Sequence, residues 1–332
     1  MSRLVLVTGG AGFIGSNIVA ALTEAGDYDV AVCDRLRTTE SGKWRNLAKH
    51  PIADFVAPEA LADWLAWNEE ALEAVVHMGA VSSTTEPDAD RIVHSNFTLS
   101  RDLWDWCARH GKRLIYASSA ATYGDGARGF RDADDLAALA GLRPLNAYGW
   151  SKALFDLYAR RHAERGEAPP QWAGLKFFNV YGPNEAHKGT MRSVAAQRWP
   201  EVARGETVKL FRSHRDDVPH GGQQRDFVYV RDCVEVVLWL LANPQVSGIY
   251  NLGTGRARSF RELVEILFRA ADRPCRIEYV DMPPGIRDHY QYFTEADMRR
   301  LRAAGYDRPF TELEDGIADY VWVYLSQADP YR

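Results

Sequence analysis

Tyr148 and Lys152 have the residue types and the spacing of a catalytic pair, because they form a Tyr-x-x-x-Lys pattern. Residues four apart on a helix share one face, so Lys152 can hold its ammonium beside the phenol of Tyr148. A free phenol has a pKa of about 10, and a neighbouring cation lowers that pKa until the phenol is usable as a base at neutral pH. The pair therefore predicts proton transfer to and from a hydroxyl. The pattern alone arises easily by chance, so its meaning depends on the elements around it.

A glycine-rich segment near the start of the chain supplies that context. An apolar run at 4–8 is followed by a predicted helix over about 13–25, with three glycines at the junction. In such a turn the backbone can approach a pyrophosphate held at the helix N-terminus. The residues expected to contact a cofactor here are Gly9, Gly12, Phe13, Ile14 and Gly15. Together with the later Tyr-x-x-x-Lys pattern, this segment predicts a nicotinamide dinucleotide and redox chemistry on a hydroxyl.

The alternation of apolar runs and helical stretches predicts how these residues are positioned. Apolar runs at 4–8, 30–33, 74–77 and 114–118 alternate with helical stretches at about 13–25, 59–72, 91–110 and 148–165. This order predicts an α/β fold with a Rossmann-like doubly wound parallel sheet that helices cover on both faces. Ligands of such a sheet bind at the carboxyl ends of its strands. The helix at 148–165 carries the Tyr-x-x-x-Lys pair on its first turns.

The second half of the chain is less regular, and we expect it to build a smaller, interleaved α/β substrate lobe. A strand is expected at 174–180 and helices at 194–204 and 258–272, whereas the polar, glycine-bearing stretch 205–225 is expected to be a loop. The predicted division is 1–178 plus about 228–258 for an NADP-binding Rossmann domain, and about 179–227 plus 259–332 for the substrate-binding lobe.

The residues after the second predicted strand bear on the choice of cofactor. Asp34 lies nineteen residues beyond Gly15, where an acid binds the adenosine ribose 2′-hydroxyl of NAD. Arg35 and Lys43 add cations that could neutralise a 2′-phosphate, so we predict NADP. NAD stays possible, because these cations could equally be ordinary solvated charges. Asp54, Met78, Gly79 and Ala80 are further expected cofactor walls. His77 is expected to be a buried core histidine.

Composition excludes several other classes of protein. The formal net charge of −5 argues against a nucleic-acid or anionic-membrane partner, because binding phosphates needs a basic surface. The four cysteines are scattered without a C-x-x-C, which favours neither a metal site nor a disulfide framework. No apolar stretch approaches the roughly 18 residues that span a bilayer. We therefore expect a cytoplasmic protein with a small-molecule partner and no metal.

Five motifs together resemble those of the extended short-chain dehydrogenase/reductase family over nearly the whole chain. They are the T-G-G-x-G-F-I-G start at 8–15, A-S-S-A at 117–120, the Tyr148/Lys152 pair, N-V-Y-G-P at 179–183 and R-D-F-V-Y-V at 225–230. Narrower stretches at 82–86, 116–124, 187–189, 251–255 and 301–306 resemble epimerases in this family that act on C6 of a nucleotide sugar. The resemblance also implies a homo-oligomer, with a pentamer suggested.

The resemblance assigns roles to individual residues. It implies that Ser119, Tyr148 and Lys152 form the catalytic set and that Lys188 is a second acid/base. It adds Ser82, Asn96, Val180 and Lys188 to the expected cofactor contacts. The substrate contacts that it implies are Ser119, Asn179, Thr190, Gln197, Phe211, Arg225 and Tyr290.

Physical reasoning supports the need for Lys188 in an epimerase. If a hydroxyl is oxidised and the ketone is re-reduced on its other face, the ketone must turn, and its oxygen then lies away from Tyr148. Lysine has an ordinary pKa of about 10.4, so neighbouring cations would have to lower it. Without the resemblance, Lys188 would be interpreted as a solvated loop lysine.

Two other functions stay open from the sequence. A nucleotide-sugar 4-epimerase or dehydratase would share every feature except the requirement for Lys188. A non-catalytic nicotinamide-binding sensor would need no organised acid/base set. Three departures from the family pattern are the long stretch 213–224, Lys176 in place of an arginine, and Arg35 in place of a small polar residue.

Overall fold

Seven strands form one sheet in which all neighbouring strands are parallel, in the order β10-β6-β5-β4-β1-β2-β3. The computed structural model describes residues 3–287 and 290–332. The strands are β1 (Arg3–Thr8), β2 (Tyr28–Cys33), β3 (Asp54–Val56), β4 (Leu72–His77), β5 (Arg113–Ser119), β6 (Trp172–Phe177) and β10 (Gly248–Leu252). The order reverses between β1 and β4, and ligands of open α/β sheets bind at such a switch point. The predicted Rossmann-like α/β fold is confirmed.

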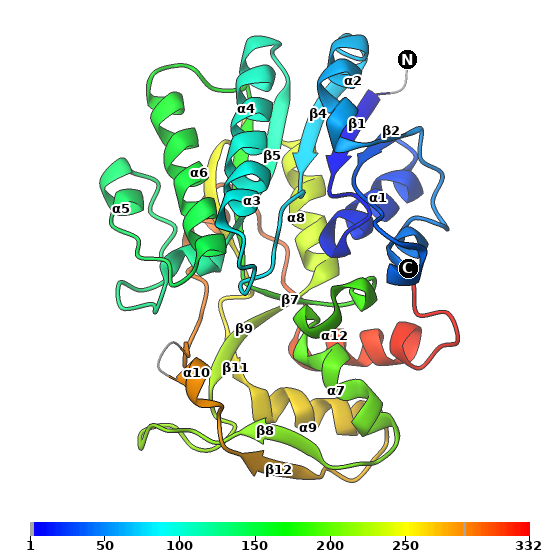
Figure 1. Ribbon diagram of the computed structural model, residues 1–332, viewed down its shortest axis with the longest axis vertical. Coiled ribbons are helices and arrows are strands. Elements are labelled where there is room, and N and C mark those ends of the chain that lie inside the picture. The colour runs from blue at the N-terminus through cyan, green and yellow to red at the C-terminus, as the bar shows by residue number, and fades with distance from the viewer. Residues whose placement is uncertain (1–2, 288–289) are drawn as a thin grey trace.

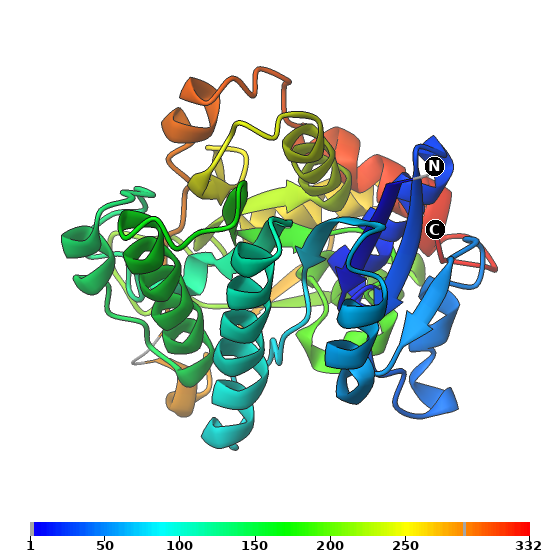
Figure 2. The ribbon, with the colours of Figure 1, turned by 90° about the horizontal axis from the view of Figure 1, so that it is seen from above.

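Helices cover both faces of this sheet because successive strand residues alternate between the faces. Val5 and Val7 of β1 belong to a core cluster with α1 and α8, whereas Leu4 and Leu6 belong to a second cluster with α2, α4 and α6. These helices are α1 (Phe13–Ala25), α2 (Leu61–Trp67), α4 (Leu99–Arg109), α6 (Ala147–Glu164) and α8 (Val230–Ala242). Figure 2 shows α4 and α6 side by side on one face of the sheet.

The smaller lobe lies below the carboxyl edge of the large sheet (Figure 1). It contains a three-stranded sheet, β11-β9-β7, and a two-stranded sheet, β12-β8. Its elements are β7 (Asn179–Tyr181), α7 (Val194–Ala203), β8 (Val208–Phe211), β9 (Gln224–Tyr229), β11 (Ala257–Ser259), α9 (Phe260–Ala270), β12 (Ile277–Val280) and α12 (Leu313–Asp319). A third core cluster joins α7, α9 and α12 to β8 and β9. Four further α-helices are short: α3 (Ala89–Val93), α5 (Leu136–Ala140), α10 (Pro284–Arg287) and α11 (Arg299–Ala303).

Several expected elements differ from the structure. The loop expected over 205–225 is wrong at its end, where residues 224 and 225 begin β9, and at Val208–Phe211, which forms β8. Val208 and Leu210 are buried, whereas Lys209 between them is exposed. A four-residue alternation is too short to outweigh the polar residues that follow it. The strand expected at 174–180 is split into β6 and β7. The helix expected at 59–72 ends at Trp67, and residue 72 already begins β4.

Other expected features agree with the structure. His77 is a core histidine, buried between Thr8 and Ser100, whose hydroxyls lie 2.6 and 2.9 Å from its ring nitrogens. The helices expected at 13–25 and 148–165 are α1 and α6. None of the helices within 3–287 and 290–332 combines the length and apolar character needed to cross a membrane.

Candidate active site

A cavity of about 1050 Å³ opens at the carboxyl ends of β1, β2, β4 and β5 and continues to β7 and β9 of the smaller lobe. It lies at the switch point of the large sheet. Most of the site residues predicted from the sequence line it: Gly9, Gly12, Phe13, Ile14, Gly15, Asp34, Arg35, Lys43, Met78, Gly79, Ala80, Ser82, Ser119, Tyr148, Lys152, Asn179, Val180 and Lys188. Residues that are far apart in the sequence therefore share one cavity.

The turn between β1 and α1 fits the pyrophosphate of a dinucleotide. Helix α1 begins after Gly12 without any side chain capping its first N–H groups, which leaves them free for an anion. A Cβ at Gly15 would lie 2.2 Å from the Gly9 carbonyl oxygen, so only glycine allows this close approach. Gly9 has a φ of 66°, in the left-handed region that glycine favours. The backbone, rather than any side chain, thus provides the anion site.

The adenosine end of the cavity holds a paired acid and base. Asp34 accepts a hydrogen bond from the Ala11 N–H at 2.9 Å and pairs with Lys43, and both side chains of this pair are largely buried. Arg35 pairs with Glu59 on the surface, where both side chains are more than half exposed. A ribose 2′-substituent placed beside Asp34 would therefore meet Lys43 at close range, and Arg35 only if that residue leaves Glu59.

Ser119 and Tyr148 lie next to each other in the wall of the cavity. Ser119 ends β5, and Tyr148 lies in the first turn of α6, which begins there because the Asn146 side chain accepts a hydrogen bond from the Gly149 N–H at 2.8 Å. Burial raises the pKa of the Tyr148 phenol, and the interaction with the Ser119 hydroxyl acts to lower it. These positions suit a serine that holds a reacting oxygen while a tyrosine moves its proton.

Lys152 lies one helical turn after Tyr148 and is almost fully buried. Its ammonium donates to the Ala117 carbonyl at 2.8 Å and makes no hydrogen bond to the Tyr148 phenol. Burial lowers the pKa of Lys152 to about 8, whereas the Asp156 carboxylate acts to raise it. The direct phenol–ammonium pairing expected from the spacing is thus replaced by a lysine fixed to the end of β5.

Lys188 reaches the same cavity from the turn Ala186–Met191 (η6), on the side of the smaller lobe. Its ammonium lies 5.1 Å from the centre of the Phe13 ring at the start of α1. Burial lowers the pKa of Lys188, and the nearby Glu185 carboxylate acts to raise it. The cavity therefore contains two candidate acid/base groups, Tyr148 and Lys188, on different elements.

A buried ion pair supports β5 and α6 from behind. Lys176 donates to the Asp156 carboxylate at 2.6 Å, and both side chains are essentially inaccessible to solvent. Lys176 also donates at 2.8 Å to Thr122, which in turn donates to the Ser119 carbonyl at 2.8 Å. Lys176, which departs from the family pattern, is thus linked through Thr122 to the backbone of Ser119.

Lys176→Met is expected to lower the free energy of unfolding by about 3–5 kcal/mol, because it leaves Asp156 buried without its cation. Urea unfolding followed by circular dichroism measures this loss. Lys209→Met is the matched control, because Lys209 is exposed on β8. A loss below about 1 kcal/mol, the range of ordinary surface substitutions, would contradict the assignment of a stabilising pair.

Arg225 is a buried cation behind the cavity wall, next to Phe260, which lines the cavity. Its guanidinium lies between the rings of Phe260 and Tyr290, at 5.5 and 5.3 Å from their centres, and donates to the Gln224 carbonyl at 2.8 Å. Burial lowers the pKa of Arg225, and Tyr290 is the only titratable neighbour in the described ranges that acts to raise it. Such a buried guanidinium suits a phosphate group.

The remaining predicted residues lie outside the cavity wall. The Asp54 carboxylate is engaged with the Trp64 indole N–H at 2.7 Å, and Asn96 lies behind the wall, where it bonds both backbone groups of Val81. Thr190 is exposed, and its carbonyl accepts from the Gln197 side chain at 3.2 Å. Phe211 and Tyr290 pack edge to face beside Arg225.

Sequence reasoning missed several residues that line the cavity on the side of the smaller lobe. They are Met191, Arg192, Ser193, Phe227 and Phe260. Phe260 follows Ser259, whose side chain forms a capping box with Glu262 at the start of α9. The S-x-x-E pattern at 259–262 predicts that a helix begins there, and this is the sequence signal that places Phe260 at a helix start.

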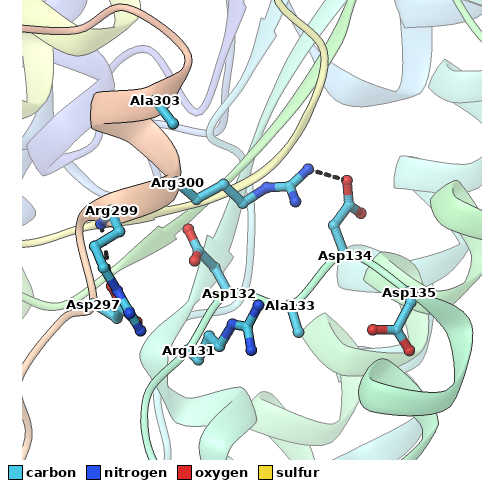
Figure 3. Close-up of a pocket in the computed structure, with 9 residues that line it drawn as sticks. All are labelled: Arg131, Asp132, Ala133, Asp134, Asp135, Asp297, Arg299, Arg300 and Ala303. Carbon is cyan, nitrogen blue, oxygen red and sulfur yellow. Dashed lines mark hydrogen bonds and ion pairs between the residues drawn. The ribbon is translucent and has the colours of Figure 1, made fainter.

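A second cavity of about 510 Å³ lies between segment 131–135 and α11, and none of the predicted site residues lines it. Figure 3 shows Arg300 reaching across it to Asp134, and Arg299 pairs with Asp297. Because these charges are already paired within the fold, we assign them a structural role.

The fold and the large cavity define a nicotinamide-dependent enzyme of the type that acts on a hydroxyl, with a glycine turn at β1 and a Ser–Tyr–Lys set at β5 and α6. Residues 5–253 match the NAD dependent epimerase/dehydratase family, and the chain belongs to this family. The chain is 51% identical over 333 residues to an ADP-L-glycero-D-manno-heptose-6-epimerase of Nitratidesulfovibrio vulgaris, covering 99% of this chain and 100% of that protein.

Two solved structures are similar over almost the whole chain. The ADP-L-glycero-D-manno-heptose-6-epimerase of Helicobacter pylori has a TM-score of 0.77 and 28% identity, covering 96% of this chain and 95% of that one. The UDP-glucose 4-epimerase of Thermus thermophilus in complex with NAD has a TM-score of 0.73 and 30% identity, covering 95% and 97%. The family resemblance identified from the sequence motifs is confirmed.

Proposed function

We propose that this protein inverts C6 of ADP-D-glycero-D-manno-heptose to give ADP-L-glycero-D-manno-heptose, without net oxidation or reduction. The observation that carries the proposal is Lys188, which lines the same cavity as Ser119, Tyr148 and Lys152. The names of the relatives support the same substrate. In a Gram-negative cell this product would serve the synthesis of the lipopolysaccharide inner core.

The chain's own residues account for the proton transfers of such a reaction. A bound nicotinamide supplies hydride transfer in both directions. In one configuration at C6 the substrate hydroxyl faces Ser119 and Tyr148, which hold its oxygen and take its proton. After the ketone turns, its oxygen faces Lys188, which donates the second proton. Lys152 and Lys188 both have a lowered pKa, as acid/base groups at neutral pH require.

The smaller lobe provides contacts for the rest of the substrate. We propose that Arg225, held between Phe260 and Tyr290, binds the diphosphate, because it is a buried cation and Phe260 lines the cavity. Asn179, Thr190, Gln197 and Phe211 complete the proposed substrate contacts. Accordingly we propose two working units, 1–178 plus about 228–258 for the cofactor and about 179–227 plus 259–332 for the substrate.

Incubation of the purified protein with ADP-D-glycero-D-manno-heptose tests the proposal directly. NMR of the sugar is expected to show conversion at C6 towards a mixture of the two epimers. Unchanged sugar, together with a protein that still binds its cofactor, would exclude the proposed reaction.

We propose NADP as the cofactor. Support comes from Lys43, which lies beside Asp34 in the buried part of the adenosine site, and from Arg35 at its rim. A 2′-phosphate would replace the Asp34 carboxylate as the partner of Lys43. We also propose a homo-oligomer, supported by exposed apolar side chains such as Trp67 and Trp322, at 83% and 60% exposure.

Lys43→Ala is expected to raise the Kd of NADP roughly 10- to 100-fold, the loss typical of one hydrogen bond to a charged group. Asp34, freed of its cation, repels the 2′-phosphate but can bind the 2′-hydroxyl of NAD, so the Kd of NAD should change little. Calorimetric titration with each cofactor measures the two Kd values and therefore their ratio. Lys49→Ala is the control, because Lys49 pairs with Asp329 instead. Equal losses for both cofactors would contradict NADP selectivity.

A further inference from the structure

Glu185 is a buried carboxylate next to the turn that carries Lys188. It is 1% exposed and accepts hydrogen bonds from three donors: the Ser193 N–H, the Ser193 hydroxyl at 2.6 Å and the Tyr320 hydroxyl at 3.1 Å. Burial raises the pKa of the Glu185 carboxyl, and the Ser193 and Tyr320 donors together with the Lys188 ammonium act to lower it. Three donors around one carboxylate suit its ionised, acceptor-only form. No residue of this network belongs to the predicted catalytic or cofactor set.

These contacts join both ends of the Lys188 turn. Glu185 precedes the turn Ala186–Met191 and Ser193 follows it, so their two hydrogen bonds close the segment into a loop. Tyr320, from the turn Tyr320–Leu325 (η7), anchors the same carboxylate to the C-terminal part of the smaller lobe. Within the turn, the Lys188 N–H donates to the Glu185 carbonyl at 3.0 Å. The Glu185 side chain therefore ties the two ends of the Lys188 turn to each other and to Tyr320.

The charge of Glu185 also acts on Lys188, because the carboxylate favours the protonated form of the ammonium. Burial lowers the pKa of His187 to about 4, so His187 is neutral at pH 7 and adds no charge. The other charged and titratable groups that act around this turn are Arg192, Tyr320, Asp34 and Lys43. Burial of Lys188 and the charge of Glu185 thus have opposite effects on the pKa of Lys188.

We propose that Glu185 is a positioning residue, which closes the Lys188 turn and keeps a negative charge within electrostatic reach of the Lys188 ammonium. The inference rests on the proposed function, because it concerns the residue that donates the second proton. In this proposal Lys188 transfers the proton, whereas Glu185 determines the geometry of Lys188 and the pH range in which Lys188 carries its proton.

Glu185→Gln tests the charge separately from the geometry. The glutamine oxygen can still accept from the Ser193 N–H, and its NH2 can donate to the two hydroxyl oxygens, so only the charge is lost. In the direction in which Lys188 donates its proton, activity falls as pH rises through the pKa of Lys188. Because a neighbouring carboxylate raises that pKa, its removal should move this fall to lower pH by about one unit. The Kd of the cofactor should not change.

Ser193→Ala is the complementary variant, because it weakens the closure of the turn and retains the charge. It should lower kcat without moving the pH profile. If Glu185→Gln does not fold, Glu185→Asp carries the test: it draws the charge back by one methylene, so the profile should move in the same direction by less. A profile that does not move in the charge variant would overturn the proposal.

A measurement independent of turnover separates this inference from the proposed function. The rate at which acetic anhydride acetylates Lys188, followed by mass spectrometry against pH, reports the pKa of Lys188 directly. We expect its midpoint to move to lower pH in Glu185→Gln and not in Ser193→Ala. A midpoint that moves in a protein without 6-epimerase activity would support the inference and refute only the proposed function. An unmoved midpoint would refute the inference itself.

Discussion

Tyr148→Phe is expected to lower the rate of C6 epimerisation roughly 10²–10⁴-fold, the contribution typical of a positioned acid/base group. The ring remains, so the packing of the first turn of α6 and the cavity wall should be preserved. Only the phenol that exchanges a proton with the substrate oxygen is lost. The decisive measurement is the rate of conversion at C6 by NMR, together with the Kd of the cofactor, which should stay close to that of the wild type.

Tyr158→Phe is the matched control for this variant. Tyr158 lies on the same helix, but its hydroxyl donates to Asp105 at 2.6 Å and does not line the cavity. Its loss should leave the rate within a few fold of the wild type. A Tyr148→Phe protein that retains most of its activity would contradict the assignment, and a protein without cofactor would show a structural role instead.

The sequence predicted those parts of the site that depend on local pattern. The glycine turn and the Tyr148/Lys152 pair each lie within one short segment, so their spacing alone describes the backbone that positions them. The parallel sheet followed from the order of apolar runs, and the switch point followed from the sheet. Lys188 came from the family resemblance alone.

The groups that the sequence did not predict depend on contacts between distant segments. The Glu185 carboxylate accepts a hydrogen bond from Tyr320, which is 135 positions away in the chain, and no local sequence pattern predicts this contact. Lys152 donates to the end of β5, although its spacing from Tyr148 suggested a direct pair. Tertiary packing decides between such partners, because a buried ammonium takes the acceptor that the neighbouring strand presents.

Lys188→Met is expected to lower epimerisation by a similar factor, roughly 10²–10⁴-fold, because the turned ketone then has no proton donor on its second side. Methionine retains most of the apolar stem beside Phe13, so the turn should keep its shape. The rate of C6 conversion again measures the loss. Lys209→Met, an exposed lysine on β8, is the matched control.

The two variants together distinguish a two-base site from a one-base site. With Lys188 removed, the epimer whose hydroxyl faces Tyr148 can still be oxidised, so only that epimer should give the ultraviolet absorbance of reduced nicotinamide. With Tyr148 removed, only the opposite epimer should do so. A 4-epimerase or dehydratase would instead keep most of its activity in Lys188→Met, because its chemistry needs no proton donor on that side. Such an outcome would replace the proposed reaction by one at the sugar ring while leaving the role of Tyr148 intact.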